Sequence, residues 1–124
     1  MIPFRGWPRE PFKGLNEPIK SLVGKYEAGL HRDGTHSRNT LAWMCDAIEG
    51  FFYDHPKVKR PEQILITDVE DWRLAKLQDY SWNVVRRDLG ALRAFYNWLR
   101  RDGDYPNLDN PVFVPPPRPD SRPQ

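Results

Sequence analysis

Residues 81–102 read SWNVVRRDLGALRAFYNWLRRD and carry the clearest helical pattern of this 124-residue chain. Apolar side chains recur there every three or four residues, the spacing that places them on one face of an α-helix. Ser81 is suited to cap the start of such a helix, and Asp102-Gly103 to end it. We therefore expect an amphipathic helix of about twenty residues, whose buried stripe consists of Val85, Leu89, Leu92, Phe95, Tyr96 and Leu99.

The opposite side of this predicted helix is basic. One stripe holds no acidic residue and consists of Asn83, Arg86, Gly90, Arg93, Asn97 and Arg100. Guanidinium groups at this spacing suit contacts to a phosphate backbone or to the edge of a DNA groove. The alternative is a solvated helix face whose basic end complements the helix dipole. The pattern alone does not choose between the two interpretations.

Two more helices are predicted in the first half of the chain. One spans about residues 17–32, with Asn16 as its cap and Gly34 as its end. The other follows Thr35-His36-Ser37 and ends near Asp54, because His55-Pro56 cannot continue it. Its apolar stripe consists of Leu41, Met44, Cys45, Ile48, Phe51 and Phe52.

A further helix, the third in chain order, is predicted between Asp54 and Ser81. It opens at Thr67 with a capping box, in which the Thr67 hydroxyl and the Glu70 carboxylate satisfy each other's free backbone donors, and it runs to about Gln78. The longest strand-like run is Ile64-Leu65-Ile66. Four amphipathic helices with short connections predict an all-α fold, a four-helix bundle in which each helix buries one stripe against the others.

Proline positions suggest the domain boundaries. Four of the 13 prolines lie at or before residue 18, and seven lie at or after residue 106. Because proline interrupts helices, we expect an extended tail over 1–15, the helical domain over 16–104, and a proline-rich linker over 105–124. Residues 115–119 are expected to form polyproline II, a semi-rigid spacer outside the core.

The composition is that of one globular domain, with 39% hydrophobic and 29% charged residues. The single cysteine, Cys45, favours a reducing compartment, and the sequence contains neither an apolar membrane span nor an export signal. We therefore expect a cytoplasmic protein. The net charge of +2 is unevenly spread: residues 61–80 hold two basic and five acidic residues, whereas 81–103 hold five basic and two acidic ones.

The sequence indicates no catalytic, metal or cofactor site. The three histidines, His31, His36 and His55, lack metal-ligand spacing, and Cys45 falls on an apolar stripe, as a core thiol does. Trp43 and Tyr53 project away from the apolar stripe of their helix, where each is free to cover a loop, contact a partner or stack on a nucleotide. We predict no cofactor and no small-molecule substrate.

In their order along the chain, these segments resemble the SAM-like core-binding domain of tyrosine recombinases, the family of phage integrases. The resemblance covers about residues 18–119. Ser37-Arg38-Asn39-Thr40-Leu41 is similar to the turn into the family's second helix, and Ile66-Thr67-Asp68-Val69 to the start of its third. Residues 89–99, LGALRAFYNWL, resemble the family's fourth helix, and Asn110-Pro111 resembles the opening of its interdomain linker.

This resemblance implies that the domain forms half of a clamp around duplex DNA, with its second and fourth helices approaching the major groove. It implies a role in DNA integration or recombination, with a catalytic domain and neighbouring protomers as further partners and association with the nucleoid. Strand cleavage in the family belongs to a carboxy-terminal domain that 124 residues do not include, so we expect no enzyme activity from this chain and no nucleophile among its five tyrosines. The implied DNA contacts, Trp43 included, are Ser37, Arg38, Asn39, Thr40, Trp43, Asn83, Arg86, Arg87 and Arg93.

Two departures from the family pattern affect these contacts. Where relatives carry basic residues one turn into the second helix, this chain has Ala42, Trp43, Cys45 and Asp46, and Val84 replaces a threonine near the start of the fourth. The alternative function is a helical protein-interaction or oligomerisation module without DNA affinity. Its aromatic interface candidates are Trp7, Phe12 and Trp43.

Overall fold

The computed structural model of the chain describes residues 15–116, which form four α-helices and no strand. Helix α1 spans Ile19–Asp33, α2 Arg38–Tyr53, α3 Ile66–Lys76 and α4 Trp82–Arg101, with a short 3-10 helix, η1, at Pro61–Gln63. The all-α prediction and the four helices are confirmed, with boundaries within about two residues. The expected tail, including Trp7 and Phe12, lies outside the described residues apart from Leu15, which is buried.

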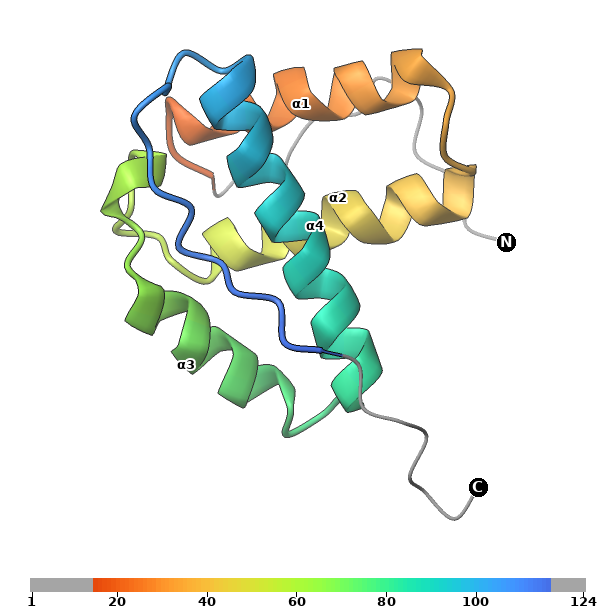
Figure 1. Cartoon of the computed structure of the whole chain (residues 1–124), viewed down its shortest axis with the longest axis vertical. Helices are drawn as coiled ribbons and strands as arrows, with labels where there is room; N and C mark the ends of the chain where they lie inside the picture. The colour runs from red at the N-terminus through yellow and green to blue at the C-terminus, as the bar shows by residue number, and fades with distance from the viewer. Residues whose placement is uncertain (1–14, 117–124) are drawn as a thin grey trace.

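Helix α4 is the central element of the bundle. It crosses α2, its most extensive partner, and also packs on α1 and α3 (Figure 1). Its predicted apolar stripe is buried throughout, and its neighbours bring aromatic rings against that stripe. Phe95 meets Tyr26 of α1 with ring centroids 5.4 Å apart and Phe52 of α2 at 5.8 Å. Cys45 lies in the interior, as predicted.

Serine caps set the start of the two long helices that cross. Ser37 Oγ accepts the Thr40 N–H at 3.1 Å, and Ser81 Oγ accepts the Val84 N–H at 3.3 Å. At the end of α1, Gly34 adopts a left-handed conformation with φ 67°, which confirms it as the stop. These local signals were readable because each depends on one residue type at one position.

Two predicted caps are wrong. Asn16 does not cap α1, because its amide donates to the Pro56 carbonyl at 2.6 Å and ties the helix start to the α2–η1 loop. Helix α3 begins at Ile66 instead of Thr67, and the carboxylate that accepts its free Leu65 N–H, at 2.8 Å, belongs to Asp68. Glu70 instead pairs with Arg73.

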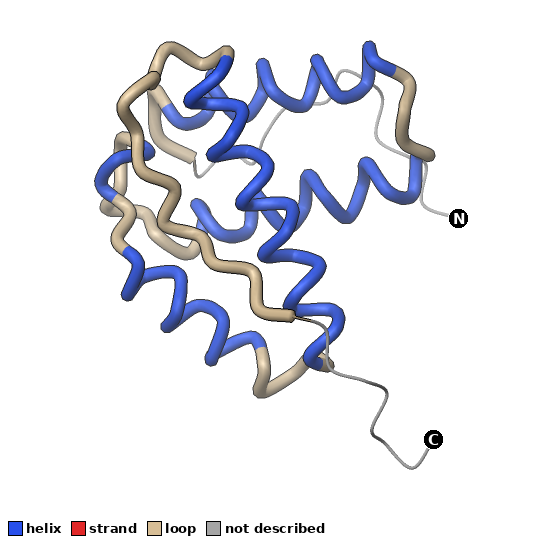
Figure 2. The backbone as a smooth tube through the Cα atoms, viewed as in Figure 1, coloured by secondary structure: helices blue, strands red, loops and turns tan. Residues whose placement is uncertain are grey.

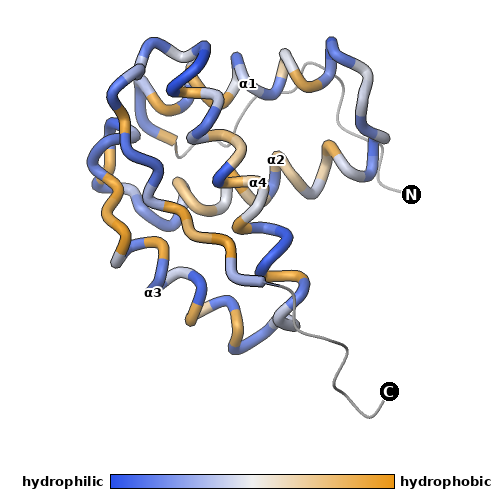
Figure 3. Tube along the Cα trace, viewed as in Figure 1, coloured by the Kyte–Doolittle hydropathy of each residue, from blue (hydrophilic) through white to orange (hydrophobic). Residues whose placement is uncertain are grey.

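The packed unit extends past the boundary expected at residue 104. Residues 105–116 contain no helix and run antiparallel to α4, between α3 and α4 (Figure 2). Leu108 and Val112 of this segment pack into the hydrophobic core. Near its end the segment has a hydrophobic run over residues 112–114, which can be followed in Figure 3. Proline-rich sequence predicted the extended backbone here but not its docking, because the docking depends on contacts with residues up to 34 positions away.

Candidate nucleic-acid interface

The residues predicted to contact DNA fall into two groups in the structure. The first lies at the start of α2 and on the adjoining part of α4: Ser37, Arg38, Asn39, Thr40, Trp43, Asn83 and Arg87. The second lies farther round α4, beside the carboxyl-terminal segment, and consists of Arg86, which is half-buried, and Arg93, which is exposed. We call the first group the α2–α4 corner.

A cation–π contact joins the two sides of the α2–α4 corner. The Arg87 guanidinium lies 4.3 Å from the centroid of the Trp43 ring, a distance at which the ring quadrupole attracts the cation. Asn83 precedes Arg87 by one helical turn, and Asn39 precedes Trp43 by one turn. The contact therefore joins α2 to α4 at Trp43 and Arg87, and Asn39 and Asn83, one turn earlier on each helix, are exposed.

A buried carboxylate is hydrogen-bonded to the Arg87 guanidinium. Asp88 is 5% exposed, and its carboxylate accepts hydrogen bonds from Nη2 of Arg87 at 3.2 Å and from Nε at 3.3 Å. Lys76 of α3 reaches the other oxygen of Asp88 at 3.4 Å. A buried charge is tolerated when it is paired and hydrogen-bonded, so Asp88 links α3 to the corner.

Lys76 is itself enclosed by aromatic rings. Its Nζ lies 5.0 Å from the Trp72 ring centroid and 4.7 Å from that of Tyr80, residues four before and four after it. Sequence reasoning missed this network, although the four-residue spacing of Trp72, Lys76 and Tyr80 was a usable signal. The sequence did not predict the ion pair between Asp88 and Lys76, because the two residues lie on different helices.

The carboxyl-terminal segment covers the second group only in part. Arg86 is half-buried and donates from Nε to the Pro115 carbonyl at 2.8 Å, while Trp82 donates from Nε1 to the Pro116 carbonyl at 3.2 Å. Asn110 donates to the Arg93 carbonyl at 3.1 Å and to Asn97 Oδ1 at 3.0 Å. The chain's own segment thus engages the Arg86 side chain and removes it from the candidate interface, whereas Arg93 and Asn97 remain exposed and lie outside the α2–α4 corner.

The start of each crossing helix is free of acidic residues. Neither α2 nor α4 has an acid in its first turn, whereas α3 has Asp68 there and ends with Arg73 and Lys76. Helix N-termini carry a partial positive charge, so acids are the usual stabilising choice and α3 follows that rule. Arg38 begins α2 instead. Both helices thus keep a positive end that attracts anions such as phosphate.

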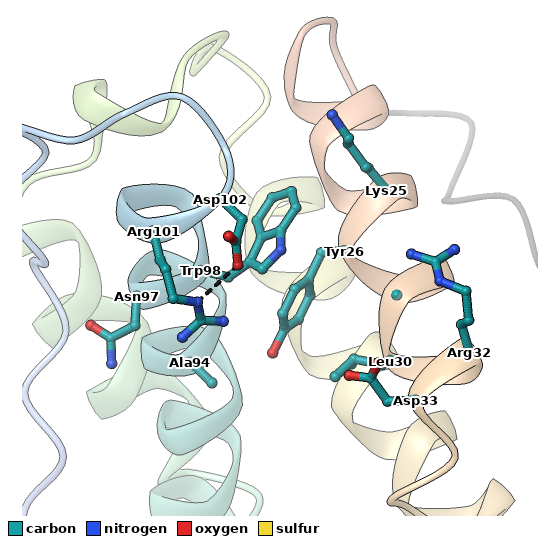
Figure 4. Close-up of a pocket in the computed structure, with 11 residues that line it drawn as sticks. Lys25, Tyr26, Leu30, Arg32, Asp33, Ala94, Asn97, Trp98, Arg101 and Asp102 are labelled. Carbon is teal, nitrogen blue, oxygen red and sulfur yellow. Dashed lines mark hydrogen bonds and ion pairs between the residues drawn. The ribbon is translucent and has the colours of Figure 1, made fainter.

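A cleft lined by both basic and acidic residues lies elsewhere, between α1 and α4 (Figure 4). It has a volume of about 560 Å³, and Lys25 and Arg32 of α1 line it together with Arg101 of α4. Asp33 and Asp102 also line it, and Asp102 pairs with Arg101 at 2.8 Å. Because acids offset the cations and no predicted contact residue lies there, we do not include this cleft in the interface.

The tyrosines nearest the core are protonated phenols at neutral pH. Tyr96 donates its hydroxyl to the Pro61 carbonyl at 2.8 Å, and burial raises its pKa above the usual value. Burial, and secondarily the nearby Cys45 thiol, raises the pKa of Tyr26 to about 12. Within residues 15–116, no three His, Cys, Asp or Glu side chains gather as metal ligands do.

No family model, curated protein or solved structure matches this chain. Across the described part of the chain, every helix is too short or too polar to cross a membrane.

Proposed function

We propose that this chain is a non-catalytic DNA-binding domain that grips duplex DNA through the α2–α4 corner. The observation that carries the proposal is the Arg87–Trp43 contact, because it joins a residue of α2 and a residue of α4 that are both candidate DNA contacts. Arg38 and Arg87 supply positive charge for phosphates, and Asn39 and Asn83 supply amides that can bond base edges. The resemblance to tyrosine recombinases supports the same role.

In this proposal the domain supplies affinity and orientation for DNA integration or site-specific recombination, while a separate catalytic domain cleaves the strands. That catalytic domain and neighbouring recombinase protomers are its further partners, and the complex acts at the nucleoid in the cytoplasm. Two cationic side chains neutralise about two phosphates, so log affinity should fall with log salt at a slope near −2. The isolated domain should bind in the micromolar range or more weakly.

The test is fluorescence anisotropy of a labelled generic duplex with the wild-type chain and three single variants. Arg38→Ala and Arg87→Ala should each weaken binding and reduce the salt slope by about 0.9, because each removes one phosphate contact. Arg100→Ala is the matched control, since it removes the same charge from an exposed position in the last turn of α4. Equal losses in all three variants would show that only net charge matters and would overturn the proposed corner.

A further inference from the structure

Exposed apolar side chains gather where α3 begins beside the carboxyl-terminal segment. Leu65 is 61% exposed, and Ile66 and Phe113 are each 65% exposed. We call these three residues the apolar patch. They line two adjoining clefts of about 570 and 330 Å³, which share Ile66, Asn110 and Pro111. Clustered apolar side chains with a polar rim mark surfaces that another molecule covers.

The two ends of the apolar patch carry opposite charge. The charged residues lining the larger cleft are Glu62 and Asp109, both acidic, whereas the one lining the smaller cleft is Arg93. Within residues 15–116, the side chains of Arg93 and Asp109 make no hydrogen bond or ion pair, with each other or with any other residue. The patch thus has an acidic end, an apolar centre and a basic end.

We propose that the apolar patch is an isologous interface between two copies of this chain. A two-fold axis through its centre sets Ile66 and Phe113 of one copy against the same residues of the other. The same rotation brings Arg93 of each copy to the Asp109 end of its partner, so both unpaired charges gain a counter-ion. This reciprocal match identifies the occupant as a second copy, because the surface complements itself in both apolar character and charge.

The interface is independent of DNA binding. None of its residues belongs to the α2–α4 corner, and apart from Arg93 all the residues that line the two clefts lie within 62–67 and 107–114. It also differs from the aromatic candidates of the sequence analysis: Trp43 is covered by Arg87, and Trp7 and Phe12 lie outside the described residues. A dimer formed here leaves both corners uncovered, so failure of either proposal leaves the other standing.

Sedimentation velocity of the full chain over a range of concentrations tests the interface. We expect a monomer–dimer equilibrium, weakened at least tenfold by Ile66→Asn combined with Phe113→Ser. Leu74→Asn is the control, because Leu74 is 52% exposed on the same helix but lines neither cleft. Far-UV circular dichroism checks that each variant is folded. A chain that stays monomeric at the highest concentration overturns the proposal.

Charge reversal tests the two-fold arrangement itself. Arg93→Glu alone and Asp109→Lys alone should each weaken the dimer, because like charges then face each other. The double variant should restore dimerisation, since Glu and Lys then face each other across the axis in both places. If the single changes weaken the dimer and the double variant does not recover it, the copies do not pair in this arrangement. The DNA affinity of Ile66→Asn should equal that of the wild type.

Discussion

The Arg87 guanidinium lies 4.3 Å from the centre of the Trp43 ring and is also hydrogen-bonded to the buried carboxylate of Asp88. A cation that is already held by a ring and a carboxylate loses little further side-chain freedom when it meets a third group. Trp43 is half-exposed because it also packs against the hydrophobic core, whereas the sequence predicted that it would project away from the apolar stripe of α2. The contact defines the geometry of the α2–α4 corner.

Replacing the buried carboxylate should loosen this arrangement. Asp88→Asn keeps the side-chain shape but leaves Lys76 and Arg87 without their anion. We expect a loss of about 1–2 kcal/mol in unfolding free energy, less than for a fully buried pair because the side chains of Lys76 and Arg87 remain 23% and 42% exposed. Urea denaturation measures it. Asp79→Asn, at an exposed position, should leave the midpoint unchanged, and an unchanged midpoint for Asp88→Asn would show that Asp88 holds nothing in place.

Adjacent arginines on α4 should behave differently. Arg86→Ala removes the donor that holds the Pro115 carbonyl at 2.8 Å, so it should lower stability by about 1 kcal/mol and change DNA affinity little. Arg87→Ala should reduce DNA affinity more strongly. Denaturation and anisotropy on the same two preparations separate the effects. A larger loss of DNA affinity for Arg86→Ala would place the interface on the covered stripe instead.

The carboxyl-terminal segment should contribute to stability as part of the core. Leu108 is 9% exposed and Val112 is 4% exposed, so Leu108→Ala should cost about 2–3 kcal/mol and Val112→Ala about 1–2 kcal/mol in unfolding free energy. Asn107→Ala, at an exposed neighbouring position, should change it by less than about 0.5 kcal/mol. Three equally small effects in urea denaturation would mean that the segment is a spacer after all.

Stability should fall at alkaline pH because of buried phenols. An unfolded tyrosine ionises near pH 10, whereas the pKa of Tyr26 in the folded chain is about 12 and that of Tyr96 is also raised. Between these values the unfolded chain releases protons that the folded chain retains, so the contribution is complete below pH 10 and is lost as pH rises. Urea denaturation at about pH 9 and 11 measures the loss.

Tyr96→Phe separates the phenol's two effects. At neutral pH it should cost about 1 kcal/mol, because the hydrogen bond to the Pro61 carbonyl is lost. Above pH 10 it should lose less stability than the wild type does, since one ionising group is gone. An equal alkaline loss in both proteins would show that Tyr96 does not titrate differently in the folded and unfolded chains.

The helices were predictable because their signals are local. The stripe from Val85 to Leu99 and the helix start at Ser81 each depend on residues a few positions apart. The cap predicted at Asn16 was wrong because of a tertiary contact: Asn16 bonds to Pro56, 40 residues away. The cap predicted at Thr67 was wrong because the neighbouring Asp68 accepts the free Leu65 N–H instead. Competition of this kind leaves no trace in a helical pattern.

The candidate site was predictable only in part for the same reason. Helical spacing placed Asn83 and Arg86 on one stripe, but it does not tell which residues another segment covers. The Arg86 side chain is hydrogen-bonded to the Pro115 carbonyl and is no longer available on that stripe. Arg87 lies outside the stripe but belongs to the candidate site because it contacts Trp43 of another helix. The resemblance to the recombinase family, and not the stripe, had named Arg87.

The most direct test of the central claim is the salt dependence of duplex binding by the full chain, measured by fluorescence anisotropy between about 50 and 200 mM salt. We expect saturable binding whose affinity falls about twelvefold over that range, the loss that two neutralised phosphates give. Absence of binding at the lowest salt, by a chain shown to be folded, would contradict it.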